Sequence, residues 1–186
     1  VYQYTLSTAW DLSTASYDSL SFNINSQDSL PRSIVLKPDG TAMFIAGKNS
    51  EKIYQYSLTT PFNLATVSYS GKSFSVAPQS PIPTSLDIKS DGTTMYVLDF
   101  LGGSNFVYQY TLSTAWDVST ASYDSKRFSV NSQDAAPTAI AFKPDYTKMY
   151  VVGDSNNSIF QYTTGLISIP TTKYHPAISN NGGQID

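Results

Sequence analysis

Few residues in this chain of 186 residues belong to types that carry out chemistry. Cysteine is absent, which excludes disulfides, cysteine-ligated metals and thiol catalysis. The single histidine, His175, stands next to Pro176 with no acid or nucleophile beside it in the sequence. Hydrolase triads, histidine metal sites and histidine acid–base pairs are therefore poorly supported. We predict no cofactor, no metal ion and no enzymatic activity, although carboxylate pairs could still meet in the folded chain.

Three aspartates, Asp39, Asp91 and Asp145, occupy the same place in the similar segments "KPDG", "KSDG" and "KPDY". Each segment lies between two apolar runs, and Asp-Gly between such runs indicates a tight turn. We interpret these acids as turn residues and not as metal ligands. No segment of the sequence matches a calcium loop of the D-x-D-x-D-G kind.

Recurring polar segments are the best candidates for ligand binding, because Asn, Gln, Asp and Ser suit the hydroxyl groups of sugars. These segments are residues 25–31, 77–83 and 131–137, and residues 47–52, 99–105 and 153–158. Phe100 and Phe106 add bulky apolar groups there. The candidate ligand-binding residues are Gln27, Asp28, Asn49, Gln79, Asp99, Phe100, Asn105, Phe106, Gln133, Asp134, Asp154 and Asn156. The alternative is that each is part of a solvated turn.

The elements that position these segments are repeated along the chain. The repeated stretches are "VYQYTLS" (1–7), "IYQYSLT" (53–59), "VYQYTLS" (107–113) and "IFQYTTG" (159–165). The units therefore start at residues 1, 53, 107 and 159, with spacings of 52, 54 and 52 residues. A period of this length is typical of propellers and other repeat architectures.

Each unit predicts four short strands. In the second complete unit these are the segments "SLDIK" (85–89), "TMYVL" (94–98), the alternating Tyr-Gln-Tyr segment and the Phe-Ser-Val segment after a longer loop. Four antiparallel strands in such a period indicate a β-propeller blade. We predict an all-β fold of four-stranded antiparallel blades over residues 1–165, nearly free of α-helix. Residues 166–186 would form a tail or a linker to a further module.

Two features repeat for reasons that we predict to be structural. Trp10 and Trp116 follow the third strand, and we expect their rings to cap the core while the aspartate after each ring caps a short turn. Stacking of these rings on a sugar is the alternative. A glutamine recurs in every unit, and we expect it to make a hydrogen bond between blades. The four glutamines are Gln3, Gln55, Gln109 and Gln161.

The number of strands does not fill a ring. The chain supplies third and fourth strands, then two whole blades, then three strands. Natural propellers close with four to eight blades. We expect a partial propeller that is completed by other protein chains or by further repeats.

The segment "PTSLDIKSDGTTMYVLD" (83–99) resembles the repeat of surface-layer (YVTN-type) and lactonase-like propellers. The wider unit "IYQYxLxTxWDxSTASY" resembles repeats in structural proteins of marine bacteriophages, as does the tail "KYHPAISNNGGQID" (173–186). The second resemblance implies a virion component such as a tail fibre, or an adhesin at the cell surface. It brings no catalytic residues with it.

We therefore expect a non-enzymatic structural or adhesion propeller of a virion or a cell surface, which binds a glycan or a partner protein through its loops. The alternatives are a pure spacer and a lactonase-like propeller enzyme. Against the enzyme, the innermost strands offer Ser33, Ser85 and Ala139, and Asp87 is their only acid. The net charge of −3 and the lack of a basic cluster argue against nucleic acid as a partner. No apolar run is long enough to insert into a membrane.

Overall fold

The computed structural model describes residues 1–164, which form thirteen β-strands in four antiparallel sheets and contain no α-helix. The predicted all-β class is therefore confirmed for these residues. Residues 165–186, with His175 and the predicted tail, lie outside the described residues. The strands are β1 (Tyr2–Leu6), β2 (Ala15–Ser21), β3 (Pro31–Leu36), β4 (Ala42–Gly47), β5 (Lys52–Leu58), β6 (Val67–Ser75), β7 (Pro83–Ile88), β8 (Thr94–Asp99), β9 (Phe106–Leu112), β10 (Ala121–Ser129), β11 (Pro137–Phe142), β12 (Lys148–Gly153) and β13 (Ser158–Thr163).

The sheets follow the repeat units of the sequence. Two sheets have four strands in the orders β3-β4-β5-β6 and β7-β8-β9-β10, one has β11-β12-β13, and one is the hairpin β1-β2. The register repeats as well, because Met43 pairs with Tyr56, and Met95 pairs with Tyr110. Equal spacing in the sequence therefore produces equal strand pairing.

The predicted turn acids are part of the turns between the first and second strands. The Asp39 carboxylate accepts hydrogen bonds from the Thr41 N–H at 3.0 Å and the Thr41 hydroxyl at 2.6 Å. It also forms an ion pair with Lys37 at 2.7 Å. Asp91 and Asp145 repeat this pattern with their own Lys and Thr neighbours.

The fourth strand is longer than predicted. A 3₁₀ turn follows the third strand in each of the first three units, and the fourth strand begins at its end, at Ala15, Val67 and Ala121. The side chains of Asp11, Asn63 and Asp117 accept a hydrogen bond from the backbone N–H two residues later, so the predicted capping role is confirmed.

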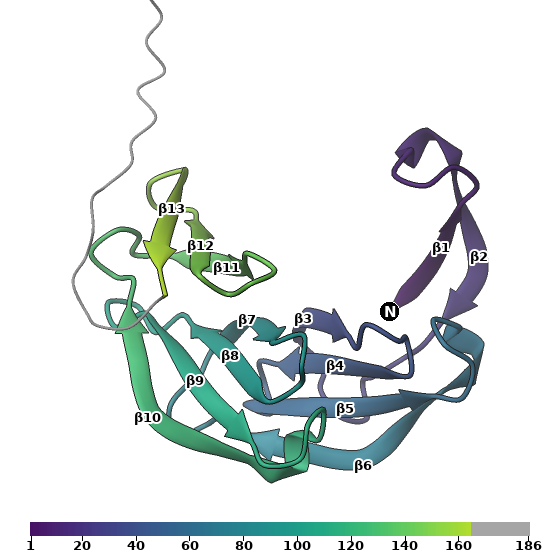
Figure 1. The fold of residues 1–186 in the computed structure, drawn as a ribbon, viewed down its shortest axis with the longest axis horizontal. Helices are drawn as coiled ribbons and strands as arrows, with labels where there is room; N and C mark the ends of the chain where they lie inside the picture. The colour runs from purple at the N-terminus through teal and green to yellow at the C-terminus, as the bar shows by residue number, and fades with distance from the viewer. Residues whose placement is uncertain (165–186) are drawn as a thin grey trace, which may run out of the picture.

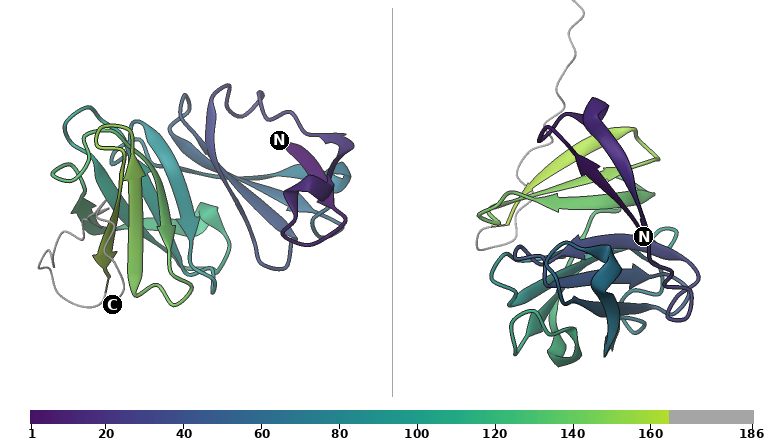
Figure 2. Two further views of the ribbon diagram at one scale, coloured as in Figure 1. Left: turned by 90° about the horizontal axis from the view of Figure 1, so that it is seen from above. Right: turned by 90° about the vertical axis from the view of Figure 1, so that its right-hand side faces the viewer.

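The sheets are arranged in an arc (Figure 1). First strands lie side by side, β3 beside β7 and β7 beside β11. Serine hydroxyls link them, since the Ser33 Oγ accepts from the Leu86 N–H at 3.1 Å and the Ser85 Oγ accepts from the Ile140 N–H at 3.2 Å. The hairpin β1-β2 and the sheet β11-β12-β13 stand on opposite sides of the molecule in two views (Figures 1 and 2).

A separate hydrophobic core fills each space between neighbouring sheets. Phe44 and Tyr110 belong to the core between the two four-stranded sheets. Tyr56 belongs to the core on the side of the hairpin, and Val151 to the core on the side of β11-β12-β13. Each sheet therefore needs a neighbour on both sides to bury its two faces.

The two tryptophans have different environments, which corrects part of our prediction. Trp116 is partly buried against the central core, with its ring 5.9 Å from that of Phe44. Trp10 is 98% exposed, so the core-capping prediction is wrong for this residue. The physical reason is that β1-β2 has no first and second strands beneath the ring among residues 1–164.

Candidate functional site

The predicted ligand loops come together in pairs at one end of the sheets. A loop between a second and a third strand contacts a loop that leads into a first strand, either of its own blade or of the next one. The Asn49 side chain donates to the Ser29 hydroxyl at 2.7 Å within one blade, and the Asn105 side chain donates to the Asn131 side-chain oxygen at 3.0 Å in the loop that leads into β11 of the next blade. The Asn156 side chain donates to the Gln133 carbonyl oxygen.

Several predicted ligand residues are used to hold these loops. Asp28, Asp99, Asn105 and Asp134 are all buried. The two Asp28 oxygens accept from the Leu30 N–H at 2.6 Å and from the N–H and hydroxyl of Ser50 at 2.7 and 2.6 Å. A sugar hydroxyl would have to displace these bonds.

The remaining predicted residues are more accessible. Asn49, Asp154 and Asn156 are exposed. Gln27, Gln79, Phe100, Phe106 and Gln133 are half-buried. The Arg127 guanidinium lies 4.3 Å from the centre of the Phe106 ring, which is the geometry of a cation–π contact. Ligand binding by these loops stays a prediction.

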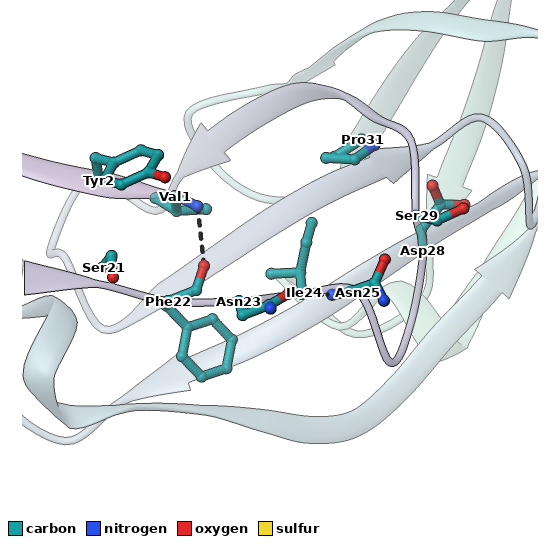
Figure 3. A pocket seen from close by; sticks show the side chains of 10 residues that line it. All are labelled: Val1, Tyr2, Ser21, Phe22, Asn23, Ile24, Asn25, Asp28, Ser29 and Pro31. Carbon is teal, nitrogen blue, oxygen red and sulfur yellow. Dashed lines mark hydrogen bonds between the residues drawn. The ribbon is translucent and has the colours of Figure 1, made fainter.

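A pocket of about 370 Å³ lies next to the hairpin (Figure 3). It is lined by residues 1–2, 21–25, 28–29 and 31. The Val1 nitrogen donates to the Phe22 carbonyl oxygen at 2.9 Å, as the dashed line in Figure 3 marks. The one predicted ligand residue in the lining is Asp28, whose oxygens are already occupied. The pocket therefore offers amide and apolar contacts without a free carboxylate.

A second site stands between the sheets β7-β10 and β11-β13, where two residues depart from the repeat. Asp87 occupies the position held by Val35 and Ala141 in the other units. Tyr146 occupies the turn position held by Gly40 and Gly92. The Tyr146 hydroxyl donates to the Ile88 carbonyl oxygen at 3.0 Å and lies close enough to the Asp87 carboxyl to lower its pKa. The two departures from the repeat therefore meet in space.

Aromatic rings enclose this site. Tyr96 pairs with Asp87 across the sheet. Its ring lies 4.4 Å from that of Phe142 and 6.1 Å from that of Tyr146. Phe142 and Tyr146 are stacked with their ring centres 5.2 Å apart. Rings around a carboxyl reduce its contact with water.

Burial raises the pKa of Asp87 to about 6, and hydrogen bonds from the Ile88 N–H and the Tyr146 hydroxyl partly oppose this rise. Burial and the nearby Asp87 charge raise the pKa of Tyr146, which stays protonated at neutral pH. The single hydroxyl proton can go to the Ile88 carbonyl or to the Asp87 carboxylate, but not to both. The pair can therefore hold or release one proton near pH 6.

Sequence reasoning noted Asp87 but missed Tyr146. The available signal was its place in the turn "KPDY", where the other units have glycine. Tyr146 adopts a φ of 58°, in the region that favours glycine. A positive φ costs free energy in a residue with a side chain, and the contacts of Tyr146 must offset this cost.

Within residues 1–164, no three His, Cys, Asp or Glu side chains come close enough to share a metal ion. Over the same part of the chain, no helix has the length and apolar character needed to cross a membrane.

Solved structures show what this fold resembles. A protein from Lactobacillus plantarum aligns with a TM-score of 0.55 and 20% identity over 87% of this chain and 44% of its own. The periplasmic gluconolactonase of Pseudomonas aeruginosa aligns with a TM-score of 0.53 and 16% identity over 72% of this chain and 35% of its own. A Bacteroides fragilis protein thought to be a 6-phosphogluconolactonase aligns with a TM-score of 0.53 and 19% identity over 77% of this chain and 40% of its own. No model of a protein family and no curated protein matches the sequence.

The fold is therefore similar to that of β-propeller proteins, some of them lactonase-like, and the chain spans 35–44% of the length of these three structures. These neighbours contradict our prediction of a phage structural or adhesion protein and our prediction that the chain is not an enzyme, because two of them carry a lactonase name. Identities of 16–20% establish the fold and leave the reaction to be argued from the residues.

Proposed function

We propose that this chain is part of a lactonase-like propeller that hydrolyses a sugar lactone, with Asp87 as the general base. The observation that carries the proposal is the meeting of Asp87 and Tyr146, two residues that depart from the repeat, at one junction between sheets. The lactonase names of two structural neighbours support the choice of substrate class.

The chemistry follows from the protonation state of Asp87. At pH 7 a carboxyl with a pKa of about 6 is mostly ionised and is still basic enough to take a proton from water. The water oxygen bonds to the lactone carbonyl carbon while its proton moves to Asp87. The ring C–O bond then breaks, and the leaving alkoxide takes that proton back. The product is the open-chain hydroxy acid.

Tyr146 positions the base. When Asp87 is ionised, the Tyr146 hydroxyl can donate to the carboxylate, and this bond lowers the pKa of Asp87. The aromatic rings of Tyr96 and Phe142 restrict water around the carboxyl. Restricted water keeps the pKa of the base near neutrality.

The experiment measures hydrolysis of glucono-1,5-lactone by the 186-residue chain, with the buffer rate subtracted. We expect the rate to rise with pH through about 6, where Asp87 becomes ionised. Asp87→Asn removes the base and should lower kcat on the order of 100-fold or more. Tyr146→Phe should move the midpoint of the pH profile upward, because it removes a bond that stabilises the carboxylate.

Asp39→Asn is the matched control, because Asp39 is an exposed acid in the turn of another blade. This variant should keep the rate and the pH midpoint. The proposal fails if the chain does not accelerate hydrolysis, or if Asp87→Asn is as active as the unchanged protein. Thermal unfolding of each variant shows that the fold is retained.

A further inference from the structure

The outer face of the hairpin β1-β2 has no packing partner, although the equivalent side chains in the third unit are buried. Tyr4 is 58% exposed, whereas Tyr110, at the same place in the third unit, is 0% exposed. The stretch Tyr2–Leu6 reads "YQYTL", which is identical to Tyr108–Leu112 in β9. The difference in burial therefore comes from the neighbours and not from the side chains.

One neighbour that the hairpin lacks is a second strand. β9 pairs with β8 on one edge and β10 on the other, whereas β1 pairs only with β2. The free edge of β1 therefore presents backbone N–H and C=O groups that can pair with an added strand. A strand with the register of β8 would place its Thr and Met opposite Thr5 and Tyr4, as Thr94 and Met95 stand opposite Thr111 and Tyr110.

The position of Trp10 indicates which residue the turn of the added hairpin must carry. In the complete blades, the equivalent rings of Phe62 and Trp116 lie on the glycine of the turn between the first and second strands. A Cβ on Gly92 would lie 2.3 Å from the Trp116 ring, and a Cβ on Gly40 would lie 2.4 Å from the Phe62 ring. The backbone N–H of Trp116 also donates to the Gly92 carbonyl oxygen at 3.0 Å. The ring therefore fits only where the turn has no side chain.

The hairpin β11-β12 of the chain does not meet this requirement, because Tyr146 stands in place of the glycine. In the sequence of that unit, Ser168 and not an aromatic residue aligns with Trp10, Phe62 and Trp116. The two glycine turns of the chain, at Gly40 and Gly92, are already covered. A second copy of the chain therefore has no uncovered glycine turn among residues 1–164.

We propose that the free edge of β1 binds a β-hairpin of the same repeat type, supplied from outside residues 1–164, whose turn carries Asp-Gly. The hairpin adds its second strand to β1, and its glycine receives the Trp10 ring. This is the arrangement that β7-β8 makes with β9 and Trp116 within the chain.

The experiment uses peptide 83–99, which contains β7-β8, as the probe. The sequence contains two tryptophans, Trp10 and Trp116. The protein therefore carries Trp116→Phe, so that all tryptophan fluorescence comes from Trp10. We expect a saturable shift of Trp10 fluorescence to shorter wavelength and slower amide exchange at residues 2–6. The matched control peptide carries Gly92→Tyr and should bind at least about tenfold more weakly, because it adds a side chain where the ring must lie. Peptide 137–153, with Tyr146, should behave like that control.

Three results would contradict the proposal. One is the absence of any change in Trp10 fluorescence and amide exchange with peptide 83–99. Another is equal binding of the glycine and tyrosine peptides. A blue-shifted Trp10 that appears as the protein alone is concentrated would show that a second copy covers the ring, and would also contradict the proposed partner.

Discussion

At the scale of single residues, one buried carboxylate is kept in the same place although different positions of the repeat supply it. In two blades the loop supplies an aspartate, Asp28 or Asp134, and the facing strand position is Gly47 or Gly153. In the blade between them, the loop has Ser80 and the strand supplies Asp99. The Asp99 Oδ1 accepts from the Ser80 hydroxyl and the Ile82 N–H, both at 2.9 Å. The same space thus holds one carboxylate in every blade.

This exchange predicts compensation between Ser80→Asp and Asp99→Gly. Asp99→Gly alone should destabilise the fold by about 1–3 kcal/mol, because the partly buried Ile82 N–H and the buried Ser80 hydroxyl lose their acceptor. Ser80→Asp alone should also destabilise it, because two carboxyl groups would share one buried site. The double variant reproduces the arrangement of Asp28 with Gly47 and should recover most of the loss. Urea unfolding of all four proteins measures the coupling between the two positions.

A double variant that is as unstable as the sum of the single changes would contradict this interpretation. Asp99 also has one oxygen, Oδ2, without a hydrogen-bond partner in the protein, and burial raises the pKa of this group. The double variant removes Asp99 and with it this unpartnered buried oxygen, which favours recovery of stability in the double variant.

At the scale of elements, glutamines on the third strands connect neighbouring blades. The Gln3 side-chain oxygen accepts from the Leu64 N–H at 2.7 Å, and the Gln55 side-chain oxygen accepts from the Val118 N–H at 3.1 Å. In both cases the donor belongs to the 3₁₀ turn of the following blade. The predicted bond between blades is confirmed for these two glutamines. The Gln109 side chain instead donates to the Asp124 carboxylate of its own sheet at 2.8 Å, so a bond between blades accounts for Gln3 and Gln55 with no ligand required.

The element-scale prediction concerns Gln55→Met, which keeps the length of the side chain and removes the acceptor. The buried Val118 N–H would then have no partner, so we expect a loss of about 1–3 kcal/mol in the free energy of unfolding. Gln161→Met is the matched control, because Gln161 holds the same repeat position on β13 and is exposed. Its effect should stay within about 0.5 kcal/mol. Equal effects of the two changes in urea unfolding would show that the bond between blades does not stabilise the arc.

At the scale of the whole molecule, burial falls from the middle of the arc toward the hairpin. Every residue of β4 is buried, whereas β1 has no buried residue. The central sheets have a core on each side, and the hairpin has a core on one side only. Local opening therefore costs less at the hairpin than in the central sheets.

Native-state hydrogen exchange tests this gradient. Amides of β4 and β8 should exchange with free energies close to that of global unfolding, because opening them exposes two cores. Amides that join β1 to β2 should exchange several orders of magnitude faster. Equal protection in the hairpin and the central sheets would contradict the gradient, and would mean that the hairpin is covered in solution.

Much of the fold could be predicted because its signals are short-range. The turn acids Asp39, Asp91 and Asp145 and the capping residues Asp11, Asn63 and Asp117 act within a few residues of themselves. The start of the fourth strand was placed too late, because the 3₁₀ turn before it is only three residues long and resembles an open loop. The candidate site was harder to predict, since Asp87 and Tyr146 come from two different units.

The sequence by itself determined the repeat, the four strands of a unit, the turns and the glutamine that joins blades, because each depends on residue type and spacing along the chain. The tertiary structure alone decided which copy of an identical stretch is buried. Trp10 and Trp116 have the same local sequence, yet one ring is exposed and the other covers Gly92. It also decided that Asp87 and Tyr146 meet and that Asp99 replaces Asp28 in its role. Burial and partnership depend on what stands on either side of a sheet, and those neighbours lie about fifty residues away in the chain.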